Sequence, residues 1–227
     1  MGCWVFRYTA DQPIATPMTS KFMLTDRGIR KALDALAALH PPIDRAITRV
    51  GYPVSRKREH SFESLARIVI GQQLSTKAAA TIATRVETAL AGDWHPHTVL
   101  AASPDQLRSA GLSRQKISYL QSLAEAVQTG ELSLTALPKQ SDEEVEAAIT
   151  AVKGFGRWSA HMYMMFSLGR PDVWPSGDLA VRVGFGRLMG WRDRPDEKRV
   201  VAEGAVFSPY RSALALLCWH VYSEAPL

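Results

Sequence analysis

Residues 141–182 read SDEEVEAAITAVKGFGRWSAHMYMMFSLGRPDVWPSGDLAVR, and this stretch decides the fold. Ser141, followed three residues later by Glu144, forms a capping-box pattern that predicts the start of a helix. Apolar residues follow at helical spacing. Gly154 is predicted to end that helix, because glycine adopts the left-handed conformation without a Cβ clash. A second helix is expected just after Gly156, which gives two helices joined by a tight glycine hairpin.

The hairpin and the loop after it suggest a functional site. A turn of this kind leaves backbone N–H groups and a helix N-terminus facing solvent, which suits a phosphate, although two glycines alone fit an ordinary turn equally well. The loop WPSGD places Asp178 at or near the N-cap of another helix, twenty positions after Trp158. A helix between the two could return Asp178 to the cleft that holds Trp158. An aspartate at this position could also serve only as a helix cap.

Four segments, in the same order, carry a resemblance to a known family. They are FESLARIVIGQQLS at 62–75, VKGFGRWSA at 152–160, WPSGDLAVR at 174–182 and PYRSALA at 209–215, the last in a helix that runs on to Trp219. Together they resemble the helix-hairpin-helix superfamily of DNA glycosylases and, within it, the alkylation-repair branch of 3-methyladenine DNA glycosylase II. The match covers about residues 61–219, and four segments at compatible spacing are more specific than any one of them.

The resemblance implies an all-α fold with two helical lobes and a cleft between them that holds a flipped base. One domain would be residues 61–170, with the QQLS turn and the hairpin. The other would join 21–60 to 171–227 and carry the aspartate. Residues 1–20 are expected to be a tail or an edge segment. The β-rich N-terminal domain of larger relatives is expected to be absent or vestigial, because only about 60 residues precede the QQLS helix.

The resemblance also implies the catalytic residues. Asp178 matches the superfamily's catalytic aspartate. Trp158 stands where bifunctional relatives carry a Schiff-base lysine, and an indole cannot form an imine, so no lyase activity is expected. Trp158 and Trp219 match aromatic residues of the base pocket, where a ring face would attract a cationic alkylated base; alternatively, both are core residues. Met162 stands where some relatives have a tyrosine, and the neighbouring Tyr163 could compensate only if the helix were rotated.

A further set of residues is expected to contact DNA. Gln73 matches the residue that fills the gap left by the flipped base, and Leu74 is the adjacent apolar candidate. Gln73 could instead be an ordinary polar residue at a helix C-terminus. Lys153, Gly154 and Gly156 would lie against phosphate, and such contacts position a protein without reading sequence.

Other roles are implied by position alone. Arg211, in the C-terminal motif, would orient Asp178 or its loop. No cofactor is required, although the hairpin in this superfamily often binds a monovalent cation. Its ligands here would be the main-chain carbonyls of Thr150, Val152 and Phe155.

The composition of the chain limits the kinds of protein and site that it can form. The chain has 227 residues, 46% hydrophobic and 22% charged, as in soluble globular proteins, and its net charge of +5 favours a polyanionic partner. Two cysteines, Cys3 and Cys218, exclude both a disulfide framework and a Cys₄ zinc or iron–sulfur site. No apolar run reaches the roughly 18 residues that span a membrane, and no secretion signal is present. We expect a reduced, cytoplasmic monomer whose partner is double-stranded DNA.

The sequence therefore predicts a monofunctional DNA glycosylase that hydrolyses the N-glycosidic bond of alkylated bases of the 3-methyladenine type. The product would be an abasic site, and the reaction would be the first step of base excision repair. One alternative is a non-catalytic helix-hairpin-helix DNA-binding protein. Another is a glycosylase for oxidised or deaminated bases, which the pair Trp158 and Trp219 disfavours without excluding it.

Overall fold

The computed structural model describes residues 24–224, and every regular element in that range is a helix. No β-strand occurs among these residues, so the predicted all-α fold class is confirmed. Both the tail or edge segment expected at residues 1–20 and any vestigial β-domain there lie outside the described residues. No helix in residues 24–224 combines the length and the apolar character needed to cross a membrane.

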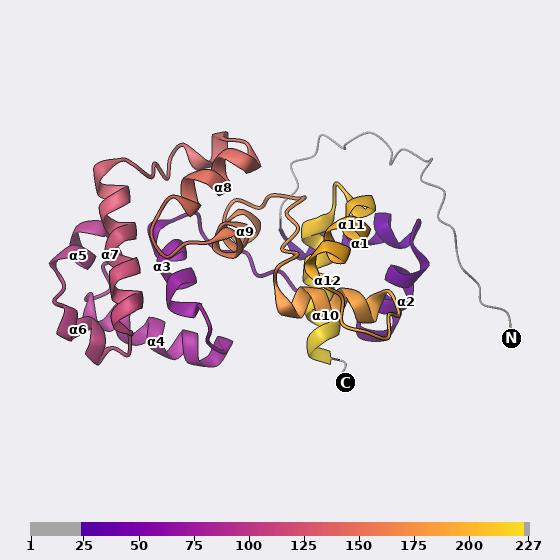
Figure 1. Cartoon of the computed structure of the whole chain (residues 1–227), viewed down its shortest axis with the longest axis horizontal. Coiled ribbons are helices and arrows are strands. Elements are labelled where there is room, and N and C mark those ends of the chain that lie inside the picture. The colour runs from indigo at the N-terminus through magenta and orange to yellow at the C-terminus, as the bar shows by residue number, and fades with distance from the viewer. Residues whose placement is uncertain (1–23, 225–227) are drawn as a thin grey trace, which may run out of the picture.

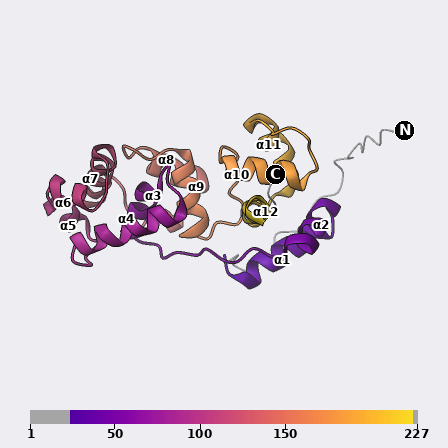
Figure 2. The ribbon, with the colours of Figure 1, turned by 90° about the horizontal axis from the view of Figure 1, so that it is seen from below.

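The helices form two groups, which lie at opposite ends of the long axis of the molecule (Figures 1 and 2). In the first group α3 packs against α4, α7 and α9, α5 and α6 pack against α7, and α8 packs against α9. The members are α3 (Phe62–Gly71), α4 (Thr76–Ala89), α5 (Pro96–Ala101), α6 (Pro104–Ser109), α7 (Arg114–Thr129), the 3₁₀ turn η1 (Leu137–Lys139), α8 (Asp142–Thr150) and α9 (Arg157–Phe166).

The second group is built from the two ends of the described chain. Helices α10 and α12 have the most extensive contact of any helix pair in residues 24–224, and α1 and α2 pack on each other and on α12. The members are α1 (Asp26–Ala37), α2 (Pro41–Val50), α10 (Leu179–Leu188), α11 (Glu197–Gly204), the 3₁₀ turn η2 (Ala205–Phe207) and α12 (Arg211–Glu224). The division into domains at 61–170, and at 21–60 plus 171–227, stays a prediction.

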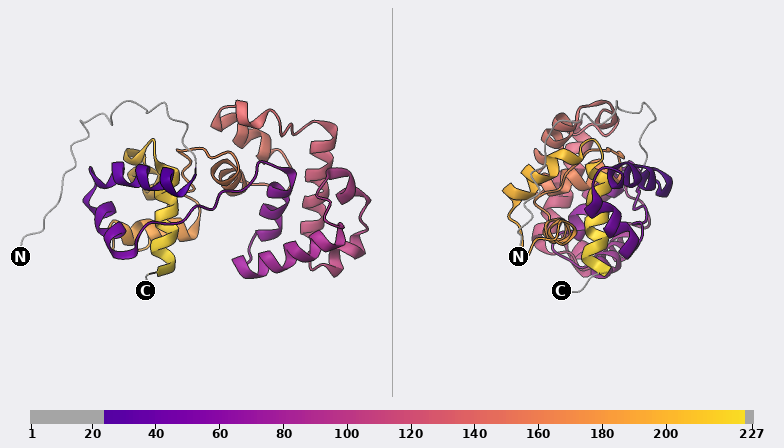
Figure 3. Two further views of the ribbon diagram at one scale, coloured as in Figure 1. Left: turned by 180° about the vertical axis from the view of Figure 1, so that it is seen from behind. Right: turned by 90° about the vertical axis from the view of Figure 1, so that its right-hand side faces the viewer.

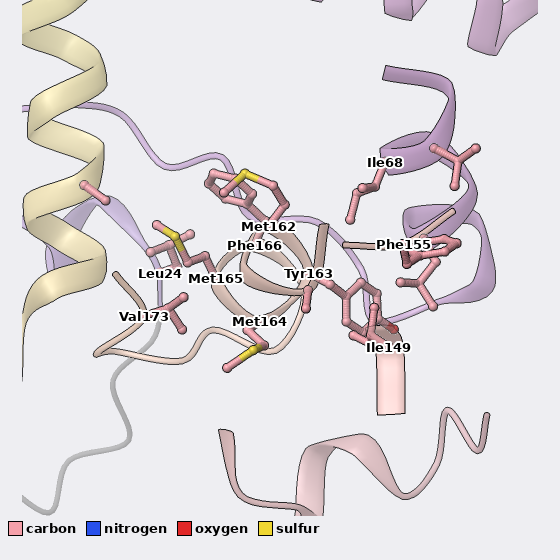
Figure 4. Packing of buried hydrophobic residues seen from close by; sticks show 14 of the residues in the cluster. Leu24, Ile68, Ile149, Phe155, Met162, Tyr163, Met164, Met165, Phe166 and Val173 are labelled. Atoms are coloured by element: carbon pink, nitrogen blue, oxygen red, sulfur yellow. The ribbon is translucent and has the colours of Figure 1, made fainter. Parts of the chain in front are cut away.

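Helix α9 lies on the side of the first group that faces the second (Figure 1), and it is buried around most of its circumference. Its residues from Ser159 to Phe166 are all buried, as expected of a helix that is apolar on every face. Figure 4 shows Tyr163 pointing toward Ile149 and Phe155 of the first group, while Met165 points toward the opposite side. Phe166, at the end of α9, packs against Trp219 of α12, so α9 is the helix of the first group that contacts the second at this point.

The hairpin between α8 and α9 forms as predicted, with one correction. Ser141 and Glu144 make the capping box, but α8 ends at Thr150 instead of continuing to Gly154. Gly154 lies in the following turn with φ +92°, and a Cβ there would come within 2.1 Å of the Tyr119 ring. Glycine is therefore needed both for the left-handed backbone and for the close approach of α7.

The crossing of α10 and α12 depends on a second glycine. A Cβ added at Gly184 would lie 2.0 Å from the backbone carbonyl oxygen of Cys218, which cannot rotate away as a side chain can. Cys218 is a free, fully buried thiol, and burial raises its pKa. The absence of a side chain at Gly184 thus sets the distance between the helix that begins after Asp178 and the helix that carries Trp219.

A segment that we call the strap, residues 51–60, joins α2 to α3 across the space between the two groups (Figure 3). At one end the Ser55 N–H donates to Asp26 Oδ1 at 2.6 Å, and the Ser55 hydroxyl donates to the Leu24 carbonyl. At the other end the Arg58 N–H donates to the Phe166 carbonyl of α9 at 2.8 Å. The strap is therefore hydrogen-bonded to both groups.

We predict that Gly184→Ala lowers the free energy of unfolding by about 1–3 kcal/mol, because the new methyl group overpacks a helix crossing. Denaturant unfolding measures this directly. Gly71→Ala is the matched control: it also lies in a helix, and its Cβ would come no closer than 3.7 Å to Ala79. Equal stability of the two variants would contradict the assignment of a tight crossing at Gly184.

Candidate active site

Asp178 begins helix α10 and faces the space between the two groups of helices. Its backbone is extended (φ −70°, ψ 125°), and its Oδ1 accepts the Val181 N–H at 2.9 Å. This is the geometry of an N-cap, as the sequence predicted. The side chain is half-buried, so the cap leaves part of the carboxylate open to solvent.

Two indole N–H groups donate to the same carboxylate. Trp158 Nε1, from the first turn of α9, lies 2.8 Å from Asp178 Oδ2. Trp219 Nε1, from α12, lies 3.1 Å from Asp178 Oδ1. Three helices thus meet at one acidic side chain. Oδ1 accepts two hydrogen bonds and Oδ2 accepts one, and a carboxylate oxygen offers two lone pairs, so Oδ2 keeps one acceptor position.

The two tryptophan rings differ in exposure. Trp158 is 39% exposed and therefore presents ring surface to solvent, whereas Trp219 is 9% exposed. The Trp219 ring is tilted 31° against that of Phe166, with centroids 5.8 Å apart, and the Arg56 guanidinium carbon lies 5.9 Å from its centroid. Of the two rings expected in the base pocket, Trp158 is therefore open to solvent and Trp219 is largely covered.

Met162 and its neighbour lie on different sides of α9. Met162 is 6% exposed and lies beside Phe166, one helical turn away (Figure 4). Tyr163 points into the first group of helices, where its hydroxyl is 2.8 Å from His60 Nδ1, and burial raises its pKa. The helix is not rotated, so Tyr163 does not compensate for Met162, and a thioether lines this side of α9.

Arg211 contacts the loop before Asp178 and not Asp178 itself. Its Nε and Nη2 donate to Oδ1 and Oδ2 of Asp172 at 2.8 and 2.7 Å, and its backbone N–H donates to Oδ1 at 3.2 Å. These hydrogen bonds raise the pKa of the Arg211 guanidinium. Of the two options that the sequence left open, the structure therefore places Arg211 on the loop. Asp172 was not predicted as a residue of the site, because none of the sequence motifs includes it.

Gln73 and Leu74, the two residues expected to fill the gap left by the flipped base, lie in the turn after α3. Gln73 is exposed and has φ +58°, a region that residues other than glycine seldom occupy, and Leu74 is 39% exposed. The preceding Gln72 donates through Nε2 to the Gly154 carbonyl at 2.9 Å and to Ser159 Oγ at 3.2 Å. Gln72 thereby ties this turn to the hairpin, a role that sequence reasoning missed.

A lysine supports the same turn from α7. Lys116 Nζ donates to the carbonyls of Ile70 and Gln72 at 2.7 and 2.8 Å, and burial lowers its pKa. An ammonium at the C-terminal end of α3 also matches the negative end of the helix dipole. Nothing in the sequence pattern distinguishes Lys116 from the other lysines.

Of the three hairpin residues expected at phosphate, Lys153 and Gly156 are exposed, whereas Gly154 is half-buried. Gly156 is the N-cap of α9 and offers no side chain, so the first N–H groups of that helix lack a side-chain acceptor. Lys153 is exposed, and its Nζ donates to Ser118 Oγ at 3.1 Å. An uncapped helix N-terminus with a lysine nearby is suited to bind an anion.

The three carbonyls expected to hold a monovalent cation come from a single turn. Thr150 ends α8, and Val152 and Phe155 follow it; the Val152 carbonyl accepts the Phe155 N–H at 3.1 Å and has a second lone pair. Main-chain oxygens of this kind suit a hard cation, and this role stays a prediction. Within residues 24–224, no cluster of three or more His, Cys, Asp or Glu side chains could hold a metal ion.

Comparison with known proteins agrees with this geometry. The sequence profile described as HhH-GPD superfamily base excision DNA repair protein matches residues 66–209. The chain is 32% identical over 168 residues to DNA-3-methyladenine glycosylase 1 of Schizosaccharomyces pombe, an alignment that covers 73% of this chain and 74% of the relative.

Solved structures are similar over most of the chain. The S. pombe 3-methyladenine DNA glycosylase in complex with abasic DNA superposes with a TM-score of 0.77 at 33% identity, covering 83% of this chain and 95% of that one. A DNA-3-methyladenine glycosidase from Bacillus halodurans gives a TM-score of 0.73 at 33% identity, covering 86% and 89%. The chain therefore belongs to the HhH-GPD superfamily of base excision DNA repair proteins, in its alkylation-repair branch.

Proposed function

We propose that this protein is a DNA glycosylase that hydrolyses the N-glycosidic bond of alkylated bases in duplex DNA and leaves an abasic site. The observation that carries the proposal is the Asp178 carboxylate, which three N–H groups hold between two groups of helices beside the open ring of Trp158. The names of the two similar proteins described above, both 3-methyladenine glycosylases, support the same reaction.

The chemistry requires the base to leave the DNA stack. A glycosylase cannot reach the target bond inside a duplex, so the nucleotide must be flipped into a pocket, and damaged bases flip at a lower cost. Cleavage of the bond to the base places positive charge on the sugar. A carboxylate held near C1′ stabilises that charge. Asp178 is suited to this role because its donors fix its orientation before DNA binds.

The attacking water needs an acceptor for its proton. Asp178 Oδ1 already accepts the Val181 amide and the Trp219 indole, whereas Oδ2 accepts only the Trp158 indole. We assign the water to the remaining lone pair of Oδ2. The exposed face of Trp158 would stack on the flipped base, with Trp219 as the second ring of the base pocket. Attraction of a cationic base to a ring contributes about 0.5–2 kcal/mol.

The remaining surface residues would hold the duplex. Gly156 and the uncapped start of α9 would contact phosphate together with Lys153, and Gln73 with Leu74 would enter the gap left by the flipped base. Contacts to the backbone supply affinity that falls with salt, in keeping with the net charge of +5. We further propose that the protein acts as a monomer, in the cytoplasm with its DNA substrate, and that it needs no cofactor.

We predict that Asp178→Asn lowers the rate of base release by about 10²–10³-fold, the usual effect of removing one electrostatic stabiliser. Asparagine caps a helix as well as aspartate does, so the start of α10 should be kept, but its NH₂ group cannot accept the hydrogen bond that Oδ2 accepts from Trp158. Base release from duplexes carrying alkylated bases measures the rate, and a gel-shift assay measures DNA binding.

The exposed Asp193→Asn is the matched control. If Asp178→Asn released damaged bases at the wild-type rate, the carboxylate would have no role in the reaction. Wild-type protein that binds DNA but releases no damaged base would favour a binding protein.

We predict that the wild-type protein does not cleave the DNA strand. Trp158 has no amine to attack the sugar, so no imine should form. Incubation with a damaged duplex and sodium borohydride should trap no covalent complex, and the abasic strand should stay intact until base or heat is applied. A borohydride-dependent adduct at the size of protein plus DNA would refute the monofunctional assignment.

We predict that Trp158→Phe and Trp219→Phe each lower kcat by about tenfold, because each removes a hydrogen bond to a charged group while keeping an aromatic ring. Single-turnover kinetics separates this effect from substrate binding. Trp191→Phe is the control, since the Trp191 ring packs on Phe185 and Arg199. Unchanged kcat in both variants would show that the indole N–H groups do not position the carboxylate.

A further inference from the structure

One face of the Trp219 ring is in contact with a cation of the protein itself. The guanidinium carbon of Arg56 lies 5.9 Å from the ring centroid, within the range of a cation–π interaction. Phe166 packs against the same ring, and together these neighbours help to leave Trp219 only 9% exposed. A base that stacks on Trp219 must therefore displace a neighbour, and Arg56 is the one on the surface.

The strap brings Arg56 to this position. Ser55 is hydrogen-bonded to the start of α1, and the Arg58 N–H to the end of α9, so only two residues lie between these contacts. Both of them, Arg56 and Lys57, are exposed and basic. The Arg56 side chain reaches the ring, whereas no cation–π contact involves Lys57 among the described residues.

Arg56 differs from an arginine that has a purely structural role. Arg67 lies over Trp94 at 5.3 Å, but it also forms ion pairs with Glu63 and Glu87. Within residues 24–224, no carboxylate pairs with Arg56. Among residues 24–224, its side chain is therefore held by this ring alone, and an exposed cation–π contact is weak enough to be displaced by a ligand.

We infer that Arg56 is a specificity-determining residue that competes with a cationic alkylated base for the Trp219 ring. This inference rests on the proposed function. A neutral base that takes this place loses only the cation–π contact of Arg56. A cationic base also meets the repulsion of the displaced guanidinium, which stays within the length of one side chain. Repulsion against one class of ligand is a common source of specificity.

The test compares two lesions in one duplex sequence: cationic 7-methylguanine and neutral 1,N6-ethenoadenine. In Arg56→Ala, kcat/KM for 7-methylguanine should rise about two- to fivefold relative to that for ethenoadenine, the factor that corresponds to the repulsion of two unit charges about 4–8 Å apart in water. Lys57→Ala is the matched control, because it removes a neighbouring exposed charge that does not reach the ring. Its ratio of kcat/KM values should stay at the wild-type value.

Two results would overturn the inference. An unchanged or lowered ratio in Arg56→Ala would mean that the guanidinium does not select between bases. Equal losses on both lesions in Arg56→Ala and Lys57→Ala, with a smaller salt dependence than the wild type, would identify Arg56 as a phosphate contact. Circular dichroism checks that the variants are folded, as expected for substitutions at exposed positions.

A binding measurement separates this inference from the proposed function. NMR titrations with 7-methylguanosine and guanosine need no turnover. The cationic nucleoside should bind Arg56→Ala about two- to fivefold more tightly than it binds the wild type, and guanosine should change less. If the wild type releases no alkylated base, the proposed function fails whatever the titration shows. If the wild type releases alkylated bases but Arg56→Ala changes neither the ratio of kcat/KM values nor the ratio of nucleoside affinities, only the role of Arg56 fails.

Discussion

The arrangement of the site depends on the hydrogen bonds to one carboxylate. Asp178 accepts N–H groups from α10, α9 and α12, at 2.9, 2.8 and 3.1 Å. Two of these donors lie on different groups of helices, so the carboxylate is placed correctly only when both groups have the right spacing. The two groups meet where Phe166 of α9 packs against Trp219 of α12. Within the second group, the close crossing of α10 on α12 at Gly184 sets the distance from Asp178 to Trp219. The packing that stabilises the core therefore also determines the geometry of the site.

Local signals in the sequence account for most of what could be predicted. Capping at Ser141 and Asp178, the glycine turn and the apolar spacing each depend on residues within a few positions, and all were found in the structure. The end of α8 was misjudged because three residues, 151–153, separate the end of the helix from Gly154, which a glycine position alone does not reveal. The family resemblance then placed Trp158 and Trp219 in one cleft, and their contact with Asp178 agrees with it.

Contacts between distant segments could not be predicted in the same way. Arg211 pairs with Asp172, Gln72 with the Gly154 carbonyl, and Lys116 with the end of α3, over sequence separations of 39, 82 and more than 40 positions. No local preference selects such partners, because each depends on how whole helices pack. The exposure of a residue has the same origin: the ring of Trp219 is covered because α9 and the strap meet there.

The position of the carboxylate at a helix start also bears on its charge. The N-terminus of a helix carries about half a positive elementary charge, which stabilises an anion there but would oppose a cation on the sugar. Asp178 contributes a full negative charge at the same place, so the end of α10 remains negative by about half a charge. A neutral cap such as serine would hold the helix equally well and leave the site positive. The cap residue must therefore be acidic for this helix start to face a developing oxocarbenium ion, and among acidic residues aspartate is the one short enough to cap.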